Sequence, residues 1–214
     1  MDNRELAVRG IGKACATPDL IVLNMNIEVC EKDYGRTMRR SSEMLDMLKS
    51  AIVSAGHDGK ELKTTSFVVN TRYDHSGHKP RFSGYTCRHG LKLEFDFDMQ
   101  SLGATLEAVA GCESKPNFHV RFTIKDPGAV SEQLLESAIE NSRRNATVLA
   151  KAAGVALGAI RRIDYNWSEL HLISSTDYQP LAPTACMDAT LRTMDIEPED
   201  IHVSDTVMVI WAIE

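Results

Sequence analysis

The segment from Asp19 to Glu31, DLIVLNMNIEVCE, alternates apolar and polar residues over most of its length. Its apolar members are Ile21, Leu23, Met25, Ile27 and Val29. Because successive side chains of a strand point to opposite faces, the pattern predicts a strand with one buried face and one face in water. Half-buried strands are typical of antiparallel sheets, so the chain is restricted to folds that contain such a sheet.

A further apolar segment, residues 5 to 16, precedes this strand, and the turn residues Thr17-Pro18-Asp19 separate the two. We therefore expect a β-hairpin in which Cys15 lies opposite residues near 21. Other strands are expected at 62–73, 81–97, 117–125, 159–168 and 201–213, with a second hairpin between the first two of these.

Helical periodicity replaces alternation in three segments, which are expected to be helices at 34–55, 98–110 and 126–153. Asp98 and Asp126 are suited to cap the second and third helices, and Pro127 fits the first turn of the third. The order β-β-α-β-β-α-β-α-β-β predicts an α+β fold with a largely antiparallel sheet and helices packed on one face. We expect one domain over 1–214, with a long irregular arm at 174–200 that contains three prolines.

Composition excludes several classes of partner. The net charge is -6, which opposes binding to nucleic acid phosphates. No apolar run approaches the ~20 residues that a membrane-inserted helix needs. The five cysteines are scattered and the first residues, MDNRELAVRG, contain no apolar leader, so we expect free thiols and a cytoplasmic protein.

Four segments are found in a characteristic order. They are LAVRGIGKACATPDL, SGYTCRHGLKLEFDFDMQSLGATLEAVA, LAKAAGVALGAIRRI and PEDIHVSDTVMVIWAI. Together they resemble the SIMPL-domain family, which is named for a mammalian protein that associates with a signalling kinase and also includes bacterial envelope proteins. The resemblance implies an α+β fold and homo-oligomers, among them ring-like or cylinder-like assemblies. It implies no catalytic residues and no cofactor.

Residues 72–89, RYDHSGHKPRFSGYTCRH, carry most of the reactive-looking side chains. The candidate metal ligands are His75, His78, Cys87 and His89. A zinc site requires three or four such groups to converge, and their spacing is not a zinc-finger pattern. Cys87 and His89 fall on the apolar face of a strand, whereas His75 and His78 fall in a polar turn. We favour a plain hairpin, and a metal-binding or small-ligand-binding protein is the alternative.

An acidic row formed by Glu94, Asp96 and Asp98 lies on the other face of the same strand. Three carboxylates suit cation binding or acid–base chemistry, so an unrecognised hydrolase is a second alternative. A solvated strand face is the favoured interpretation, and the sequence contains no nucleophile elbow, zincin or phosphate-loop motif. We therefore expect a protein that is not an enzyme. The G-x-G at Gly10 and Gly12 predicts a bulge or a close backbone approach.

The final strand, IHVSDTVMVIWAIE, is apolar on both faces, so it is either central in the sheet or covered by a neighbouring subunit. The candidates for subunit contact are Trp167, Val207, Val209 and Trp211. The favoured function is a non-enzymatic, self-associating binding or scaffold module, with a homo-oligomer as the expected assembly.

Overall fold

A computed structural model describes residues 4–76, 79–166, 170–179 and 196–214. The chain forms two compact units. Unit 1 comprises Met1–Pro18, Ile124–Ser174 and Glu199–Glu214, and unit 2 comprises Asp19–Thr123 and Ser175–Pro198. Neither unit is a continuous stretch of sequence, which is why no linker composition marks a boundary between them.

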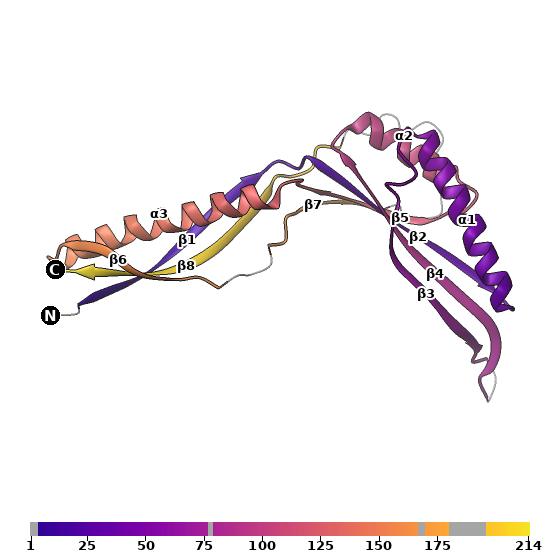
Figure 1. The fold of residues 1–214 in the computed structure, drawn as a ribbon, viewed down its shortest axis with the longest axis horizontal. Helices are drawn as coiled ribbons and strands as arrows, with labels where there is room; N and C mark the ends of the chain where they lie inside the picture. The colour runs from indigo at the N-terminus through magenta and orange to yellow at the C-terminus, as the bar shows by residue number, and fades with distance from the viewer. Residues whose placement is uncertain (1–3, 77–78, 167–169, 180–195) are drawn as a thin grey trace. The chain divides into compact units, whose positions relative to one another are not determined.

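Unit 2 is built on a five-stranded sheet with the strand order β3-β4-β2-β5-β7. Its strands are β2 (Leu20–Glu31), β3 (Lys63–Asp74), β4 (Arg81–Asp96), β5 (Asn117–Thr123) and β7 (Ile173–Tyr178). Helix α1 (Tyr34–Ser54) follows β2 and helix α2 (Met99–Ala110) follows β4, and both lie on one face of the sheet (Figure 1). The succession β2-α1-β3-β4-α2-β5 is the split βαβ arrangement of ferredoxin-like domains.

The core of unit 2 fills the space between this sheet and its two helices. The alternating residues of β2 supply one side of the core, as predicted, and Leu48 and Ile52 of α1 are fully buried against them. The opposite face of the sheet carries the polar residues of the same strands, so the half-buried pattern of the sequence is confirmed.

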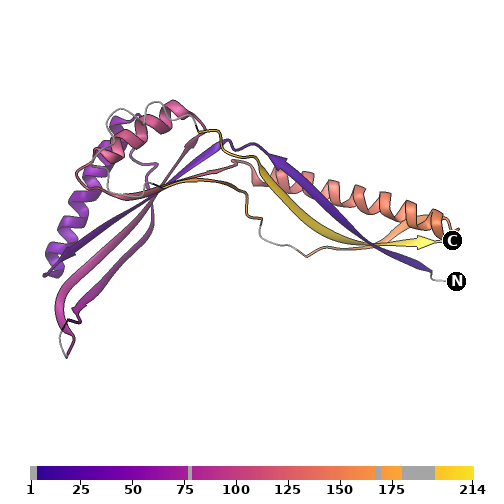
Figure 2. The ribbon, with the colours of Figure 1, turned by 180° about the vertical axis from the view of Figure 1, so that it is seen from behind.

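Unit 1 is a three-stranded antiparallel sheet covered by one long helix. The strand order is β1-β8-β6, with β1 at Glu5–Ala16, β8 at Ile201–Ile213 and β6 at Leu157–Asp164. Helix α3 (Pro127–Ala153) runs along β1 and β8 in both views (Figures 1 and 2). The buried residues of α3 are Val130, Leu134, Ala138, Ser142, Ala146 and Ala150, a stripe of mostly small side chains spaced four apart.

The G-x-G motif of β1 explains how closely this helix approaches the strand. A side chain at Gly10 would collide with the carbonyl oxygen of Ala138, and one at Gly12 with the carbonyl oxygen of Leu134. The close approach lets two side chains of α3 cover the edge of β1. Asn141 Oδ1 accepts a hydrogen bond from the Ile11 N–H at 3.0 Å, and Ser137 Oγ accepts one from the Lys13 N–H at 3.2 Å. The predicted close backbone approach is therefore confirmed.

The predicted hairpin at Thr17-Pro18-Asp19 is wrong. β1 pairs with β8, where Cys15 lies opposite His202, while β2 pairs with β4 and β5. The turn residues instead mark the point at which the chain leaves unit 1 for unit 2. A local turn signal does not reveal pairing with a strand at the other end of the chain, so the error is one of long-range topology.

The irregular arm expected at 174–200 begins with a strand, β7, so that part of the prediction is also wrong. The buried position of its sequence, ISSTDY, is occupied by a serine and not by an apolar residue. Ser174 is buried, and its hydroxyl donates to the Glu199 carbonyl at 2.7 Å. Residues 180–195 of the arm lie outside the described part of the chain.

The helix ends follow the sequence signals. Asp98 accepts hydrogen bonds from the Gln100 and Ser101 N–H groups, and Asp126 accepts one from Ala129 with Pro127 in the first turn. In the ranges that the structure describes, no helix is long and apolar enough to cross a membrane.

Candidate functional site

The candidate metal ligands of the 72–89 hairpin do not converge. Cys87 and His89 lie on the helix-facing side of β4 and are buried, whereas His75 is exposed near the end of the hairpin. His78 lies outside the described residues. Among residues 4–76, 79–166, 170–179 and 196–214, no group of three His, Cys, Asp or Glu side chains is arranged to hold a metal ion.

Cys87 and His89 instead connect the sheet to its surroundings. The Cys87 thiol donates to Ser41 Oγ of α1 at 3.4 Å. His89 Nε2 lies 2.9 Å from Thr64 Oγ1, and the His89 ring contacts Phe67 edge-on with centroids 4.9 Å apart. Burial, together with the nearby Lys49 ammonium, lowers the pKa of His89 below its usual value. A neutral, packed imidazole is the result, and its buried Nδ1 atom has no hydrogen-bond partner among the described residues.

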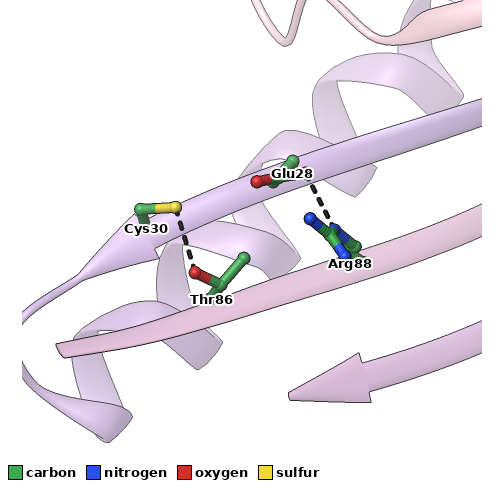
Figure 3. Close-up of polar contacts among 4 residues, drawn as sticks. All are labelled: Glu28, Cys30, Thr86 and Arg88. Atoms are coloured by element: carbon green, nitrogen blue, oxygen red, sulfur yellow. Dashed lines mark hydrogen bonds and ion pairs between the residues drawn. The ribbon is translucent and has the colours of Figure 1, made fainter. Parts of the chain in front are cut away.

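The open face of the same sheet, opposite the helices, carries cross-strand polar pairs between β2 and β4. Arg88 Nε donates to Glu28 Oε2 at 2.9 Å, and Cys30 Sγ lies 3.3 Å from Thr86 Oγ1 (Figure 3). These four side chains lie on the exposed surface of two neighbouring strands, where ion pairs contribute little stability. The arrangement is a solvated sheet face.

The acidic row does not act as a unit in this structure. Glu94 forms an ion pair with Lys92 at 2.8 Å, and Asp98 caps α2. Asp96 belongs to the last residues of β4, opposite Leu20. Each of the two outer carboxylates therefore has a structural partner of its own.

In the part of the chain that the structure describes, β3 forms the outer edge of the sheet and pairs with β4 on one side only. Eleven of its twelve residues are exposed, and only Val69 is half-buried. Phe67 and Val68 leave 44% and 45% of their surface in solvent. An edge strand with exposed apolar side chains is a template for pairing with another strand.

Comparison with known proteins identifies the family. A model of the SIMPL family, described as a protein of unknown function (DUF541), matches residues 6–211. The chain belongs to the SIMPL family. The prediction from its four sequence segments is therefore confirmed.

SIMPL relatives from three bacteria show how divergent the family is. The 26 kDa periplasmic immunogenic protein of Brucella melitensis is 24% identical over 163 residues, which cover 74% of this chain and only 65% of that protein. The uncharacterized protein YggE of Edwardsiella ictaluri is 21% identical over 215 residues, which cover 98% of this chain and 87% of that protein. YggE of Escherichia coli K12 is 20% identical over 217 residues, which cover 100% and 85% of the two chains. Neither the family description nor the name YggE states an activity.

In this SIMPL-family chain, three of the residues considered for subunit contact are buried within unit 1. Val207, Val209 and Trp211 face α3, where Trp211 Nε1 donates to Ser142 Oγ at 3.3 Å. β8 is the central strand of its sheet, which accounts for its apolar character without a second subunit. Trp167 lies outside the described residues.

The exposed residues of the β3–β4 hairpin were not among the sequence candidates. Phe67, Val68, Tyr73 and Phe82 are all 44% or more exposed. The signal is present in the sequence as apolar residues in a strand, but such residues are assigned to the core by default. The strand order, with β3 at the edge, accounts for the exposure of Phe67, Val68 and Tyr73, and Phe82 lies in the part of β4 that pairs with β3 alone.

Proposed function

We propose that this SIMPL-family chain is a non-enzymatic protein that associates with copies of itself and acts as a binding or scaffold module. The observation that carries the proposal is the outer edge of β3. Glu94 and Asp98 each have a structural partner, and no group of three potential metal ligands is found among the described residues, so these observations do not favour the hydrolase or the metal-binding alternative.

The central part of β3 lacks the features that keep edge strands from pairing. Residues Ser66–Thr71, SFVVNT, contain no charge and no proline, and they pair with β4 without a register shift. Lys63, Arg72 and Asp74 confine charge to the two ends of the strand. Natural edge strands are usually protected by lysines, prolines or bulges within the strand.

Unit 1 provides a contrast within the same chain. The edge of β1 is covered by Asn141 and Ser137 of α3, which bond the N–H groups of Ile11 and Lys13. One sheet edge is thus covered by side chains, while β3 stays exposed and has no second strand beside it among the described residues. This difference supports a role for the β3 edge in pairing.

A second β3 strand, running antiparallel, is the partner that this edge fits best. Antiparallel pairing of two identical strands about a two-fold axis is self-complementary, which is the common geometry of homodimers. In such a pair the uncharged centres of the two strands lie against each other, and Lys63 at one end of each strand lies near Asp74 at the opposite end of the second strand, so that opposite charges meet.

Light scattering of the full chain tests the proposal. We expect the wild-type protein to be larger than a monomer and Val68→Lys to shift it towards the monomer, because the substitution places a charge in the middle of the open edge. Val53→Lys on α1 is the matched control, since Val53 is also exposed, and it should leave the size unchanged. A monomeric wild-type protein would refute self-association. An unchanged Val68→Lys oligomer would instead remove β3 as its interface.

A cytoplasmic location is part of the proposal. Cys15, Cys30, Cys87 and Cys112 are free thiols, and the first two are exposed, which suits a reducing compartment. The Cys15 thiol lies 3.7 Å from Asp200, and desolvation by its surroundings together with this carboxylate raises the thiol pKa and keeps it protonated. The Brucella relative is named periplasmic, so fractionation of cells that produce the native protein is the decisive test.

A further inference from the structure

The outer part of the β3–β4 hairpin extends beyond the rest of unit 2. β2 ends at Glu31, which lies opposite Tyr85, so the residues of β4 before Tyr85 pair with β3 alone. Both views show the hairpin continuing past the end of β2 and the start of α1 (Figures 1 and 2). A two-stranded ribbon is marginally stable in water unless its side chains find cover.

A β-bulge in this ribbon changes the direction of its side chains. Arg72 pairs with Gly84 and Tyr73 pairs with Phe82, so Ser83 is an extra residue. Gly84 has a φ of 131°, and a side chain there would collide with the carbonyl oxygen of Glu31. Arg72 Nε donates to Ser83 Oγ at 3.1 Å and holds the bulge in place. Ser83 and Gly84 are therefore the residues that form and stabilise the bulge.

The bulge brings together two rings that a regular strand would separate. Phe82 and Tyr85 are three residues apart, so in an unbroken strand they would lie on opposite faces. In the structure their ring centroids are 5.3 Å apart. Bulges commonly re-aim a side chain next to a functional surface.

These rings belong to an aromatic row formed by Tyr34, Tyr85, Phe82 and Tyr73. Successive centroids lie 5.6, 5.3 and 6.0 Å apart, and every contact is edge-on. Tyr34, Phe82 and Tyr73 leave 52%, 51% and 49% of their surface in solvent. The row is therefore an ordered apolar surface without a partner in the described part of the chain.

The sequence segments next to Tyr34, Tyr73 and Phe82 are basic, although the whole chain is acidic. Residues 31–43, 72–76 and 79–81 together contain seven Lys or Arg and four Asp or Glu. Three of the four carboxylates have local partners: Asp33 caps α1, Glu43 pairs with Arg40, and Asp74 accepts from the Ser76 N–H at 2.9 Å.

We propose that the aromatic row docks on the headgroup layer of a lipid bilayer that contains anionic lipids. Tyrosine rings suit this layer because one end is apolar and the other can hydrogen-bond, and arginines bind lipid phosphates. A projecting ribbon can also reach a flat partner. The contact is peripheral and requires no membrane-spanning segment.

The two competing partners fit this surface less well. A second copy of the same surface would bring like charges together, which opposes a homotypic contact here. A single-stranded nucleic acid requires ring faces on which successive bases stack, whereas these rings pack edge-on against one another. The docking surface includes Tyr73 at the end of β3, whereas the edge proposed for self-association is centred on Ser66–Thr71.

Sedimentation of the full chain with vesicles tests this proposal. We expect binding to phosphatidylcholine vesicles that contain phosphatidylglycerol, weaker binding to phosphatidylcholine alone, and loss of binding as salt is raised. The double variant Tyr73→Ser/Phe82→Ser should weaken binding by roughly tenfold or more, because two large apolar surfaces no longer enter the bilayer interface. Arg81→Gln, which leaves the rings in place, should weaken binding by a smaller factor.

Val148→Ser in α3 is the control, because it removes from unit 1 an apolar side chain that is 63% exposed, more than Tyr73 or Phe82. This variant should bind vesicles like the wild type, and circular dichroism should show that all variants are folded. The proposal is overturned if the wild type does not bind the anionic vesicles, or if the double variant binds them equally well. It is also overturned if the same variant abolishes binding to a single-stranded oligonucleotide or changes the oligomer size while vesicle binding persists.

Discussion

Gly12→Ala tests most directly how the long helix of unit 1 is held. Gly12 lies between the two residues whose N–H groups bond to α3, Ile11 and Lys13. A methyl group at this position would collide with the Leu134 carbonyl oxygen and lie 3.0 Å from Ala138 Cβ. Both neighbours belong to the helix, so α3 must move away from the strand.

The cost follows from that movement. Forcing a methyl group into a packed interface costs about 1–3 kcal/mol. A helix that retreats also weakens the two side-chain hydrogen bonds to β1, which contribute about 1 kcal/mol each. Replacing glycine by alanine also lowers the conformational entropy of the unfolded chain, which offsets roughly 0.4–1 kcal/mol of this loss. We expect a net loss of about 2–4 kcal/mol in the free energy of unfolding.

Urea denaturation followed by tryptophan fluorescence measures this loss. Trp211 is buried against α3, so a Trp167→Phe background makes the emission report on the contact of β8 with α3. Gly128→Ala in the first turn of α3 is the matched control, because its methyl group meets only the end of the Asp126 side chain. It should be neutral or slightly stabilising. A Gly12→Ala protein with the wild-type midpoint would show that the helix does not pack on β1 as described.

Two further predictions concern unit 2. His57 and His89 have lowered pKa values, chiefly through burial, so the unfolded chain binds protons first as the pH falls below about 6.5. Their contribution to stability is therefore complete above that pH and is lost as the pH falls below it. The loss is at most about 1.4 kcal/mol per pH unit for each histidine. When urea midpoints are plotted against pH, the slope of the curve should be smaller for His89→Gln than for the wild type. Gly84→Ala places a side chain at a φ of 131° and against the Glu31 carbonyl, so it should cost roughly 1–3 kcal/mol of stability. The substitution should also disorder the aromatic row, which near-ultraviolet circular dichroism of the tyrosines measures. An unchanged spectrum would contradict the bulge geometry.

Patterns confined to a few neighbouring residues allowed accurate prediction. The apolar face of β2, the positions of Cys87 and His89 on the core side of β4, and the caps Asp98 and Asp126 all follow from local rules. In each case one element determines which way its own side chains point.

The inner faces of the helices were harder to predict, because small and polar residues take core positions. In α1 the first half of the buried face is Thr37 and Ser41, whose hydroxyls bond the Asp33 carbonyl and the Cys87 thiol. In α3 the buried stripe continues through Ala146 and Ala150, while the neighbouring and larger Leu149 is 49% exposed. The close approach to the glycines of β1 selects small residues over large ones.

The candidate surface on the hairpin was hidden for a different reason. Predicting strand faces depends on unbroken alternation, and one extra residue reverses the assignment for every residue beyond it. Ser83 is such a residue. Unbroken alternation would place Phe82 on the face opposite Tyr85, whereas in the structure the two rings lie in one row. The histidines and the cysteine of RYDHSGHKPRFSGYTCRH are the residues that suggest chemistry, yet they are divided between a polar turn and the core. The pair that organises the exposed surface is Ser83 and Gly84, which are small residues without a metal-binding group. The surface chemistry of this hairpin is therefore set by backbone geometry, and a search for reactive side chains alone would overlook it.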